Sequence, residues 1–210
     1  MTRELMTFEE AARRLVEVGR RFDRRGWVLG TSGNFSVVVS EQPLRLAMTP
    51  SGAFKGELTA SGFVEVDGAG ELVAGAPSRP SAEAKLHVAI ARIRGAGAVL
   101  HTHSVWSTVL SDQHAAASGL AIEGYEMLKG LSGVATHAHR EWVPILENDQ
   151  DMKRLAVIAA NTLERHPDAH ALLLRRHGMY TWGDTLLEAI RHVEIMEFLL
   201  EVVGRNHRGA

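Results

Sequence analysis

The sequence predicts an α/β protein, a single-domain α/β/α sandwich built on a central, largely antiparallel mixed sheet. Roughly nine short segments rich in β-branched and aromatic residues alternate with about four long segments of helical apolar periodicity. Short turns between neighbouring strands indicate antiparallel pairs, and helices between other strands allow parallel ones. Because there is no internal repeat or linker-like segment, we expect one domain over residues 1–210, with a core of about 8–203 and a frayed tail at 204–210.

The composition limits the classes of function. At 210 residues, 45% of them hydrophobic, the chain is long enough for a full core. Its net charge is −2 and its basic residues are spread out, so we expect no nucleic-acid partner and no membrane surface. There is no cysteine and no apolar run of about 18 residues, so we expect a cytoplasmic protein that binds any metal through nitrogen and oxygen. Eleven histidines make imidazole ligands plausible.

The first helix is marked by its capping residues. Thr7 is placed to cap the helix, and Glu10 three residues later completes a capping box. Apolar residues then recur at helical spacing until Gly26 stops the helix near Arg25. We expect this helix to cover one face of the sheet.

Two loops of small residues lie beside the next two strands. Residues 30–34 precede a strand at 35–39, and a strand at 44–48 runs into residues 49–52. Such loops expose backbone N–H groups and hydroxyls that can hold a phosphate. Either loop alone is more often an ordinary turn, so the pair suggests a phosphate site without establishing one.

A hairpin and a helix follow. Residues 63–67 and 71–73 flank a short glycine-containing turn, as in a hairpin. Pro80 lies near the start of a helix expected over residues 81–94, where its missing N–H costs nothing. The start of this helix is suited to an anion, and Glu83 there is at least an acid that the helix dipole favours.

Two histidines end the next strand, residues 98–103. Alternate side chains of a strand share a face, so His101 and His103 point the same way from a rigid element. Neutral imidazole is the commonest metal ligand among side chains, and two on one face form half of a metal site. The alternative is two polar residues at a strand end that bond to backbone, and spacing alone does not separate these interpretations.

The second half of the chain continues the alternation of strands and helices. The expected elements are a helix at 105–110 capped by Ser104, strands at 121–126 and 143–146, a helix at 151–165, strands at 171–174 and 179–182, and a helix at 185–203. A second His-x-His, His137-Ala138-His139, competes with the first, and we interpret it as an exposed rim loop. No role is assigned to His114, His166, His170, His192 or His207.

Five motifs follow one another in a fixed order. They are Gly33-Asn34, Thr49-Pro50-Ser51-Gly52, Pro80-Ser81-Ala82-Glu83, His101-Thr102-His103 and Arg176-His177-Gly178. In this order the chain resembles the class II aldolase/adducin-like family over about residues 8–203. The resemblance implies a class II aldolase-like fold, in agreement with the predicted sandwich.

The resemblance also implies a site and an assembly. The implied ligands of one divalent metal ion per subunit are His101, His103 and His177. Three nitrogen ligands favour Zn²⁺, and an open fourth position would make the site catalytic. The implied residues for the phosphate of a phosphorylated sugar substrate are Asn34, Ser51, Gly52 and Ser81. Members of the family are usually tetramers with active sites near subunit contacts, so a homotetramer is expected.

Within the family, residues 125–130 (Tyr-Glu-Met-Leu-Lys-Gly) resemble a dehydratase more than an aldolase. The implied activity is that of a hydro-lyase: metal-dependent dehydration of 5-methylthioribulose 1-phosphate to 2,3-diketo-5-methylthiopentyl 1-phosphate in methionine salvage. Glu126 matches the acid/base position of such dehydratases. Glu83 matches that of the aldolases and is the second candidate.

Two other functions stay open. An aldolase or epimerase acting on another sugar phosphate would share the enediolate chemistry, but Ala82 stands where the aldolases usually have a serine. A non-catalytic adducin-like binding domain is the remaining alternative. Such domains tend to lack the ligand histidines, whereas this chain has all three.

Overall fold

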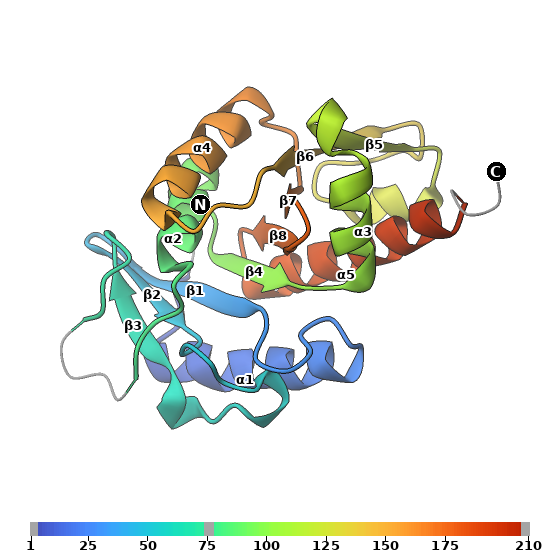
Figure 1. The fold of residues 1–210 in the computed structure, drawn as a ribbon. Helices are drawn as coiled ribbons and strands as arrows, with labels where there is room; N and C mark the ends of the chain where they lie inside the picture. The colour runs from blue at the N-terminus through green and yellow to red at the C-terminus, as the bar shows by residue number, and fades with distance from the viewer. Residues whose placement is uncertain (1–3, 74–77, 207–210) are drawn as a thin grey trace.

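The computed structural model describes residues 4–73 and 78–206, and within them one eight-stranded sheet forms the centre of the molecule (Figure 1). Its strand order is β3-β2-β1-β4-β8-β7-β6-β5. The strands are β1 (Asn34–Glu41), β2 (Leu44–Met48), β3 (Val64–Asp67), β4 (Ala98–Thr102), β5 (Gly119–Glu123), β6 (Arg140–Leu146), β7 (Ala171–Leu174) and β8 (Gly178–Gly183). Neighbouring strands are antiparallel except β6 and β7. The predicted α/β fold with a mixed, largely antiparallel sheet is therefore confirmed.

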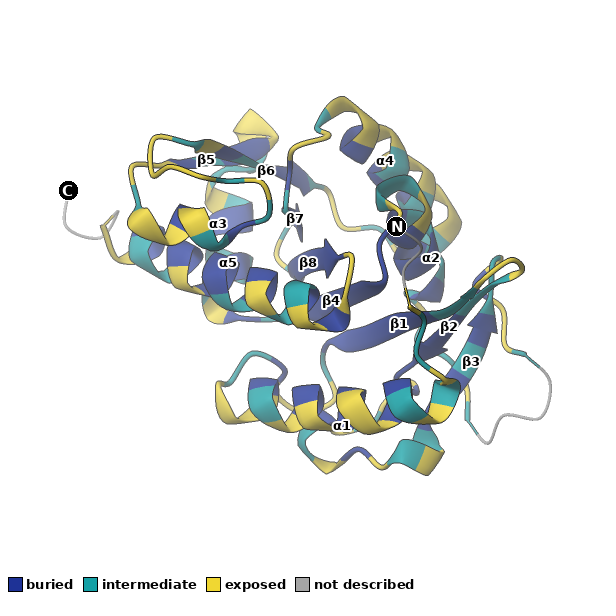
Figure 2. Cartoon of the chain, turned by 180° about the vertical axis from the view of Figure 1, so that it is seen from behind, coloured by how far each residue is buried: buried dark blue, intermediate teal, exposed yellow. Residues whose placement is uncertain are grey.

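Five α-helices in the described part of the chain cover the two faces of the sheet. They are α1 (Phe8–Arg24), α2 (Ala84–Arg94), α3 (Val105–Gln113), α4 (Met152–Arg165) and α5 (Leu186–Asn206). Helices α2 and α4 share a buried apolar cluster with one face, and α1, α3 and α5 pack on the other. Figure 2 shows the buried strands between these helices, whose outer surfaces are exposed. No helix found in residues 4–73 and 78–206 is both long and apolar enough to cross a membrane.

The pleat of β4 decides where its histidine points. Leu100 packs with α1 and α5, whereas Val99 packs with α2 on the opposite face. Because side chains alternate along a strand, His101 follows Val99 onto the α2 face. The strand register places His101 opposite Asn34 of β1 and Tyr180 of β8. The sheet thus aims His101 at the amino end of α2.

Local sequence signals set several helix ends correctly. The Thr7 hydroxyl accepts a hydrogen bond from the Glu10 N–H at 3.2 Å, as the predicted capping box requires. The Ser104 hydroxyl caps α3, and the Asp151 carboxylate caps α4. Each such cap stabilises its helix by about 1 kcal/mol.

Other predicted boundaries were wrong. Helix α2 begins at Ala84 instead of 81, because Pro80 pairs with Pro50 in an isolated β-bridge and the chain then turns before the helix. Residues 71–73 form only the single bridge between Val66 and Leu72 rather than a strand. Strand β5 ends at Glu123, and a short 3₁₀ helix, η4 (Glu126–Gly130), follows it.

The first three residues of the expected frayed tail are not frayed. Helix α5 extends through Asn206, so residues 204–206 are helical. Residues 207–210, including His207, lie outside the described residues, as do residues 74–77.

Candidate active site

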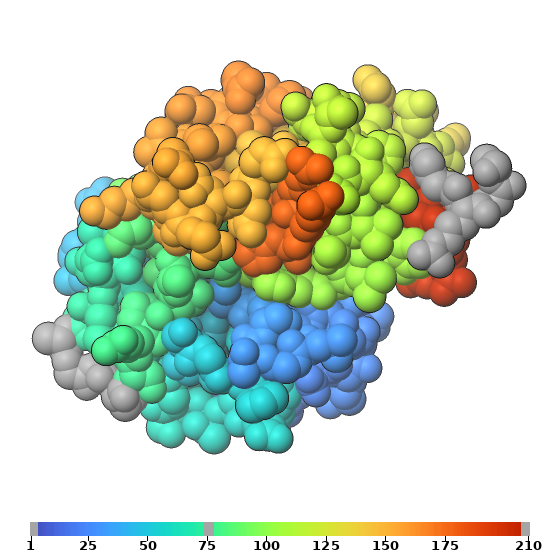
Figure 3. Space-filling model, viewed as in Figure 1, coloured from blue at the N-terminus to red at the C-terminus, as the bar shows by residue number. Residues whose placement is uncertain are grey.

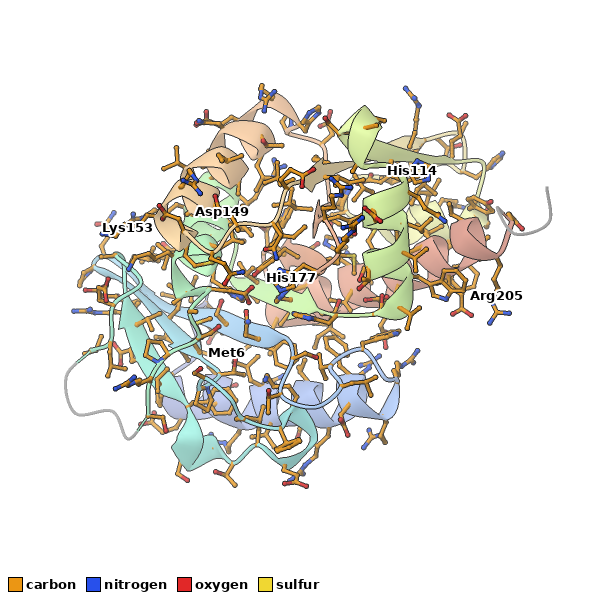
Figure 4. The ribbon with its side chains drawn as sticks, in the orientation of Figure 1. Met6, His114, Asp149, Lys153, His177 and Arg205 are labelled. Atoms are coloured by element: carbon orange, nitrogen blue, oxygen red, sulfur yellow. The ribbon has the colours of Figure 1, made fainter. Side chains whose placement is uncertain are left out.

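The carboxyl ends of β4 and β7 carry the three predicted metal ligands. His101 is the second-to-last residue of β4, and His103 directly follows that strand. His177 lies in the turn between β7 and β8. Figure 4 shows His177 in the middle of the molecule, close to the end of β4. A Cβ atom on Gly178 would collide with the Thr102 carbonyl, so glycine there lets this turn lie against β4.

The three imidazoles converge on one point. His101 Nε2 lies 2.7 Å from His103 Nε2. The ring of His177 has its centre 5.0 Å from that of His101 and 4.6 Å from that of His103. The three candidate ligand atoms all lie within 4.8 Å of one another. The predicted ligand set is therefore brought together, although its members come from separate parts of the chain.

Hydrogen bonds and burial prepare these rings to act as ligands. His101 Nδ1 donates to the Met179 carbonyl at 2.9 Å, which leaves Nε2 with its lone pair directed into the cluster. His177 Nδ1 lies 3.2 Å from Asn148 Oδ1 and can donate in the same way. Burial, and then the nearby His177, lowers the pKa of His103 to about 4, and burial lowers the pKa of His101 well below 6.5. At neutral pH the imidazoles of His101 and His103 are therefore uncharged, as metal ligation requires.

Glu83 is the carboxylate that faces this cluster. One of its oxygens lies 3.5 Å from His101 Nε2 and the other 3.3 Å from His177 Nε2. Its side chain is 12% exposed. The carboxylate precedes α2 directly, so the N–H groups of the first helical turn favour its negative charge.

A buried chain of hydrogen bonds fixes the position of Glu83. Asn34 Nδ2 donates to Glu83 Oε2 at 2.5 Å, and Asn34 Oδ1 lies 2.5 Å from His87 Nε2. His87 Nδ1 lies 2.8 Å from the Ser36 hydroxyl. An amide oxygen only accepts, so His87 donates from Nε2 and accepts from Ser36 through Nδ1. Burial lowers the pKa of His87 to about 4, in agreement with this neutral form.

The cluster opens into a cavity of about 360 Å³. The four residues expected at the phosphate, Asn34, Ser51, Gly52 and Ser81, all line this cavity together with Glu83, His103 and His177. In Figure 3 the blue and cyan surface of residues near 30 and 50 and the orange surface of residues near 150 and 176 lie on the same face, with green surface between them. The structure thus brings the predicted phosphate and metal residues to one cavity.

Lys55 supplies positive charge in the cavity. Among the described residues that line it, Lys55 is the only lysine or arginine. Its ammonium donates to the Thr31 carbonyl at 2.9 Å and the Ala53 carbonyl at 2.7 Å, which ties the two small-residue loops together. Burial lowers the pKa of Lys55 to about 8. An ammonium has three donors, so one remains for an anion.

Glu126 does not join this cavity within the same chain. It lies in η4, which packs against α5 near the far edge of the sheet, and its side chain is 72% exposed. Its carboxylate accepts from Lys129 at 2.6 Å. The sequence places Glu126 at the end of a strand, but the topology puts β5 four positions away from β4 in the sheet.

Glu197 supports the strand that carries the ligands. This buried residue of α5 accepts a hydrogen bond from the Thr102 hydroxyl at 2.7 Å, and Thr102 stands between His101 and His103. Burial raises the pKa of Glu197 to about 7.

The sequence interpretation missed Lys55, His87 and Glu197. His87 of α2 lies one helical turn after Glu83, the residue before that helix, which is a weak signal that both face the site. Lys55 and Glu197 carry no such signal, because only packing shows that each charged side chain is buried.

Comparisons with known proteins show which family this chain is similar to. Residues 13–203 match the Class II Aldolase and Adducin N-terminal domain family. A methylthioribulose-1-phosphate dehydratase of Methylococcus capsulatus is 45% identical over 201 residues, or 95% of this chain and 96% of that protein. A methylthioribulose-1-phosphate dehydratase of Parvibaculum lavamentivorans is 43% identical over 93% of each.

Solved structures show the same fold. An L-fuculose-1-phosphate aldolase from Thermus thermophilus superposes with a TM-score of 0.73 at 26% identity, over 95% of this chain and 97% of that one. YgbL from Klebsiella pneumoniae superposes with a TM-score of 0.79 at 27% identity, over 95% and 91%.

Proposed function

Because the chain belongs to the Class II Aldolase and Adducin N-terminal domain family, we propose that it dehydrates 5-methylthioribulose 1-phosphate to 2,3-diketo-5-methylthiopentyl 1-phosphate. It is a hydro-lyase of methionine salvage. The observation that carries this function is the similarity to methylthioribulose-1-phosphate dehydratases over nearly the whole of both chains. The cluster of three histidines beside Glu83 supplies the groups that such a reaction needs.

The donor set fits a divalent metal ion. Three imidazole nitrogens suit Zn²⁺, and His101, His103 and His177 would hold it. In His101 and His177 the other ring nitrogen lies beside an oxygen acceptor. A cation between His101 Nε2 and His103 Nε2, which lie 2.7 Å apart, would also relieve the repulsion between their lone pairs. When bound, the cation supplies Lewis acidity that polarises the C2 carbonyl of the substrate. We propose one Zn²⁺ ion at this site in each subunit.

The substrate phosphate is proposed to bind at the other end of the cavity. The hydroxyls of Ser51 and Ser81, the N–H of Gly52 and the amide of Asn34 line that part of the cavity. Lys55 adds a positive charge that offsets the charge of the phosphate dianion. Binding the phosphate there would direct the sugar carbons toward Glu83 and the three histidines.

The first chemical step needs a base at C3. This carbon is acidic because it adjoins the C2 carbonyl, and loss of its proton precedes departure of the C4 hydroxyl. Within one chain Glu83 is the carboxylate near the ligands, and the Asn34 hydrogen bond fixes its position. Glu83 is therefore proposed to take the C3 proton.

A second proton must reach the departing C4 hydroxyl, which leaves as water. Glu126 is proposed for this role, as its sequence context indicates. It lies outside the cavity of its own chain and is exposed, so it would have to enter the site of a neighbouring subunit. This role therefore depends on the homotetramer that the family resemblance implies.

One assay tests the function. The purified protein is mixed with 5-methylthioribulose 1-phosphate, with and without a chelator, and the ultraviolet absorbance of the enol of the dione is recorded. Dehydration that a chelator stops and added Zn²⁺ restores is expected. Absence of this product, together with cleavage of fuculose 1-phosphate, would instead identify an aldolase, the activity named for the superposed Thermus thermophilus protein.

A further inference from the structure

We propose that His139, Glu141 and His170 form a second site for a divalent metal ion, at the end of the sheet opposite the candidate active site. The sequence alone predicts an exposed rim loop around His139 and indicates no role for His170. The exposed part of that loop is His137, whose side chain is 62% exposed. His139 turns inward instead, toward the fully buried carboxylate of Glu141.

The strand directions place this cluster away from the first. Glu141 is the second residue of β6, His139 precedes that strand, and His170 precedes β7. Because β6 and β7 are parallel, their amino ends lie side by side. His177 follows the carboxyl end of the same β7, so the two clusters occupy opposite ends of the strand. The second site is therefore separate from the proposed dehydration.

The candidate ligand atoms have the spacing of a metal site. Glu141 Oε2 lies 2.9 Å from His139 Nε2 and 3.0 Å from His170 Nδ1. Ligand atoms around a tetrahedral zinc ion are about 3.4 Å apart, as follows from bond lengths near 2.1 Å. In the first cluster the corresponding contact is 2.7 Å, so the second set departs less from that spacing than the first.

The hydrogen bonds around the cluster orient its ligands. His170 Nε2 lies 2.8 Å from the Ser132 carbonyl and must donate to it, because a carbonyl oxygen only accepts. His170 Nδ1 then faces a carboxylate oxygen, which requires a cation between the two atoms, either a proton or a metal ion. The His170 N–H donates to Glu141 Oε1 at 2.8 Å and holds the carboxylate in place. A carbonyl or carboxylate partner on the outer nitrogen is the usual arrangement around a metal-binding histidine.

A metal ion can reach this cluster from solvent. His139 and His170 line a cavity of about 600 Å³, together with His192, Asp184 and Glu188. The cavity leaves room for water to complete the coordination of the ion. Two imidazoles and one carboxylate suit zinc or cobalt, whereas magnesium and calcium prefer sites made of oxygen atoms alone.

The bound ion would join segments that are distant in sequence. It links the loop before β6, the strand itself and the turn before β7, so it stabilises the folded chain by mass action. Thermal stability is therefore the property that this site changes.

The test counts bound zinc in a chain whose first site is disabled. His177→Ala protein is loaded with zinc, passed through a desalting column and analysed for metal, and its melting temperature is measured with and without zinc. One zinc ion per chain is expected, with a rise of several degrees in the melting temperature. The double variant His177→Ala/His139→Ala should bind no zinc and show no rise in melting temperature when zinc is added. His139 is partly exposed, so His139→Ala is less disruptive to folding than a change at the fully buried Glu141. Glu141→Gln serves as a second variant that removes a ligand of the same site.

His166→Ala in the same background is the matched control, because it removes an imidazole from the turn before β7 without touching the cluster. It should keep the zinc ion. Cobalt(II) absorption in the visible range reports the coordination directly and should vanish with His139→Ala. The proposal fails if His177→Ala protein retains no zinc, which would mean that protons alone hold the cluster, or if its zinc survives loss of His139.

Discussion

Glu83 Oε1 lies 3.3 Å from His177 Nε2, which joins the amino end of α2 to the turn between β7 and β8. The sheet makes this contact, since β1, β4 and β8 are neighbours and α2 packs across them. The contact places a carboxylate beside a candidate metal ligand, where one group can take a proton while the cation stabilises the charge that forms.

Removal of a ligand should empty the first metal site. His101→Ala and His177→Ala should each lower the zinc content by one ion per chain and reduce turnover by about 1,000-fold or more, because Lewis acidity is lost. Elemental analysis and the dehydration assay measure the two effects. An unchanged zinc content in either variant would refute the ligand set.

The two carboxylates should be separable. Glu83→Gln and Glu126→Gln should each reduce kcat by roughly 100- to 10,000-fold with zinc retained, because each removes one proton transfer. Near-normal turnover in Glu126→Gln would leave Glu83 as the sole acid/base, and the reverse result would favour Glu126.

Mixed oligomers test whether Glu126 acts between subunits. Glu126→Gln chains lack the acid but keep the ligands, and His177→Ala chains keep the acid but lack a ligand. Co-expression should restore part of the activity, since an intact site forms where one chain contributes its ligands and the other its Glu126. If mixtures stay as inactive as the separate variants, Glu126 does not act across a subunit contact.

The hydrogen bonds behind Glu83 should matter for rate more than for binding. His87→Leu removes the donor to Asn34 and should lower kcat about 10-fold with little change in KM or zinc content, because Glu83 loses its fixed position. Ser36→Ala removes only the outer hydrogen bond and should have a smaller effect. Equal loss in both variants, or a change confined to KM, would contradict a positioning role.

Lys55 should act on the phosphate. Lys55→Met should raise KM about 10-fold or more and weaken competitive inhibition by inorganic phosphate, because the cavity loses its charged donor. Lys153→Met removes an exposed lysine of α4 and should leave both constants unchanged. Inhibition by phosphate that is the same in Lys55→Met and wild type would place the anion elsewhere.

Glu197 should make stability depend on pH. Burial raises the pKa of Glu197 to about 7, whereas the unfolded chain releases the same proton near 4.5. The folded state therefore holds the proton more tightly, and the free energy of unfolding falls as pH rises from 4.5 to 7, by about 3 kcal/mol in total. Glu197→Gln cannot ionise, so its stability relative to wild type should rise by that amount over this range. Urea unfolding of both proteins at pH 5 and pH 8 measures the difference, and a constant difference would show that Glu197 does not titrate there.

Much of the fold followed from local patterns. Helix α1 begins where Thr7 and Glu10 predict, and β4 is the strand that the apolar run before His101 indicates. These features depend on neighbours within a few residues, which a single sequence displays. The start of α2 was misplaced because Pro80 pairs with Pro50, and that partner lies far away along the chain.

Only part of the candidate site could be predicted from the sequence, because contacts between segments that are distant along the chain leave no local pattern. The order of motifs marked the residues that line the metal and phosphate cavity. It could not show that Asn34 holds Glu83, since that hydrogen bond depends on how α2 packs on β1. The sequence favoured Glu126 from its neighbours, but the order of strands leaves it outside the cavity of its own chain.

The sequence alone determined the types of chemistry: imidazoles two apart on one strand, a third before a glycine, small-residue loops and two candidate carboxylates. Residue type and short-range spacing decide these, because the strand pleat and the turn geometry repeat in every protein. Only the tertiary structure decided which groups meet. The strand order brought Glu83 to His177, buried Lys55 and Glu197, and turned His139 toward Glu141. Contacts between distant segments depend on how the whole core packs, and no local pattern encodes that packing.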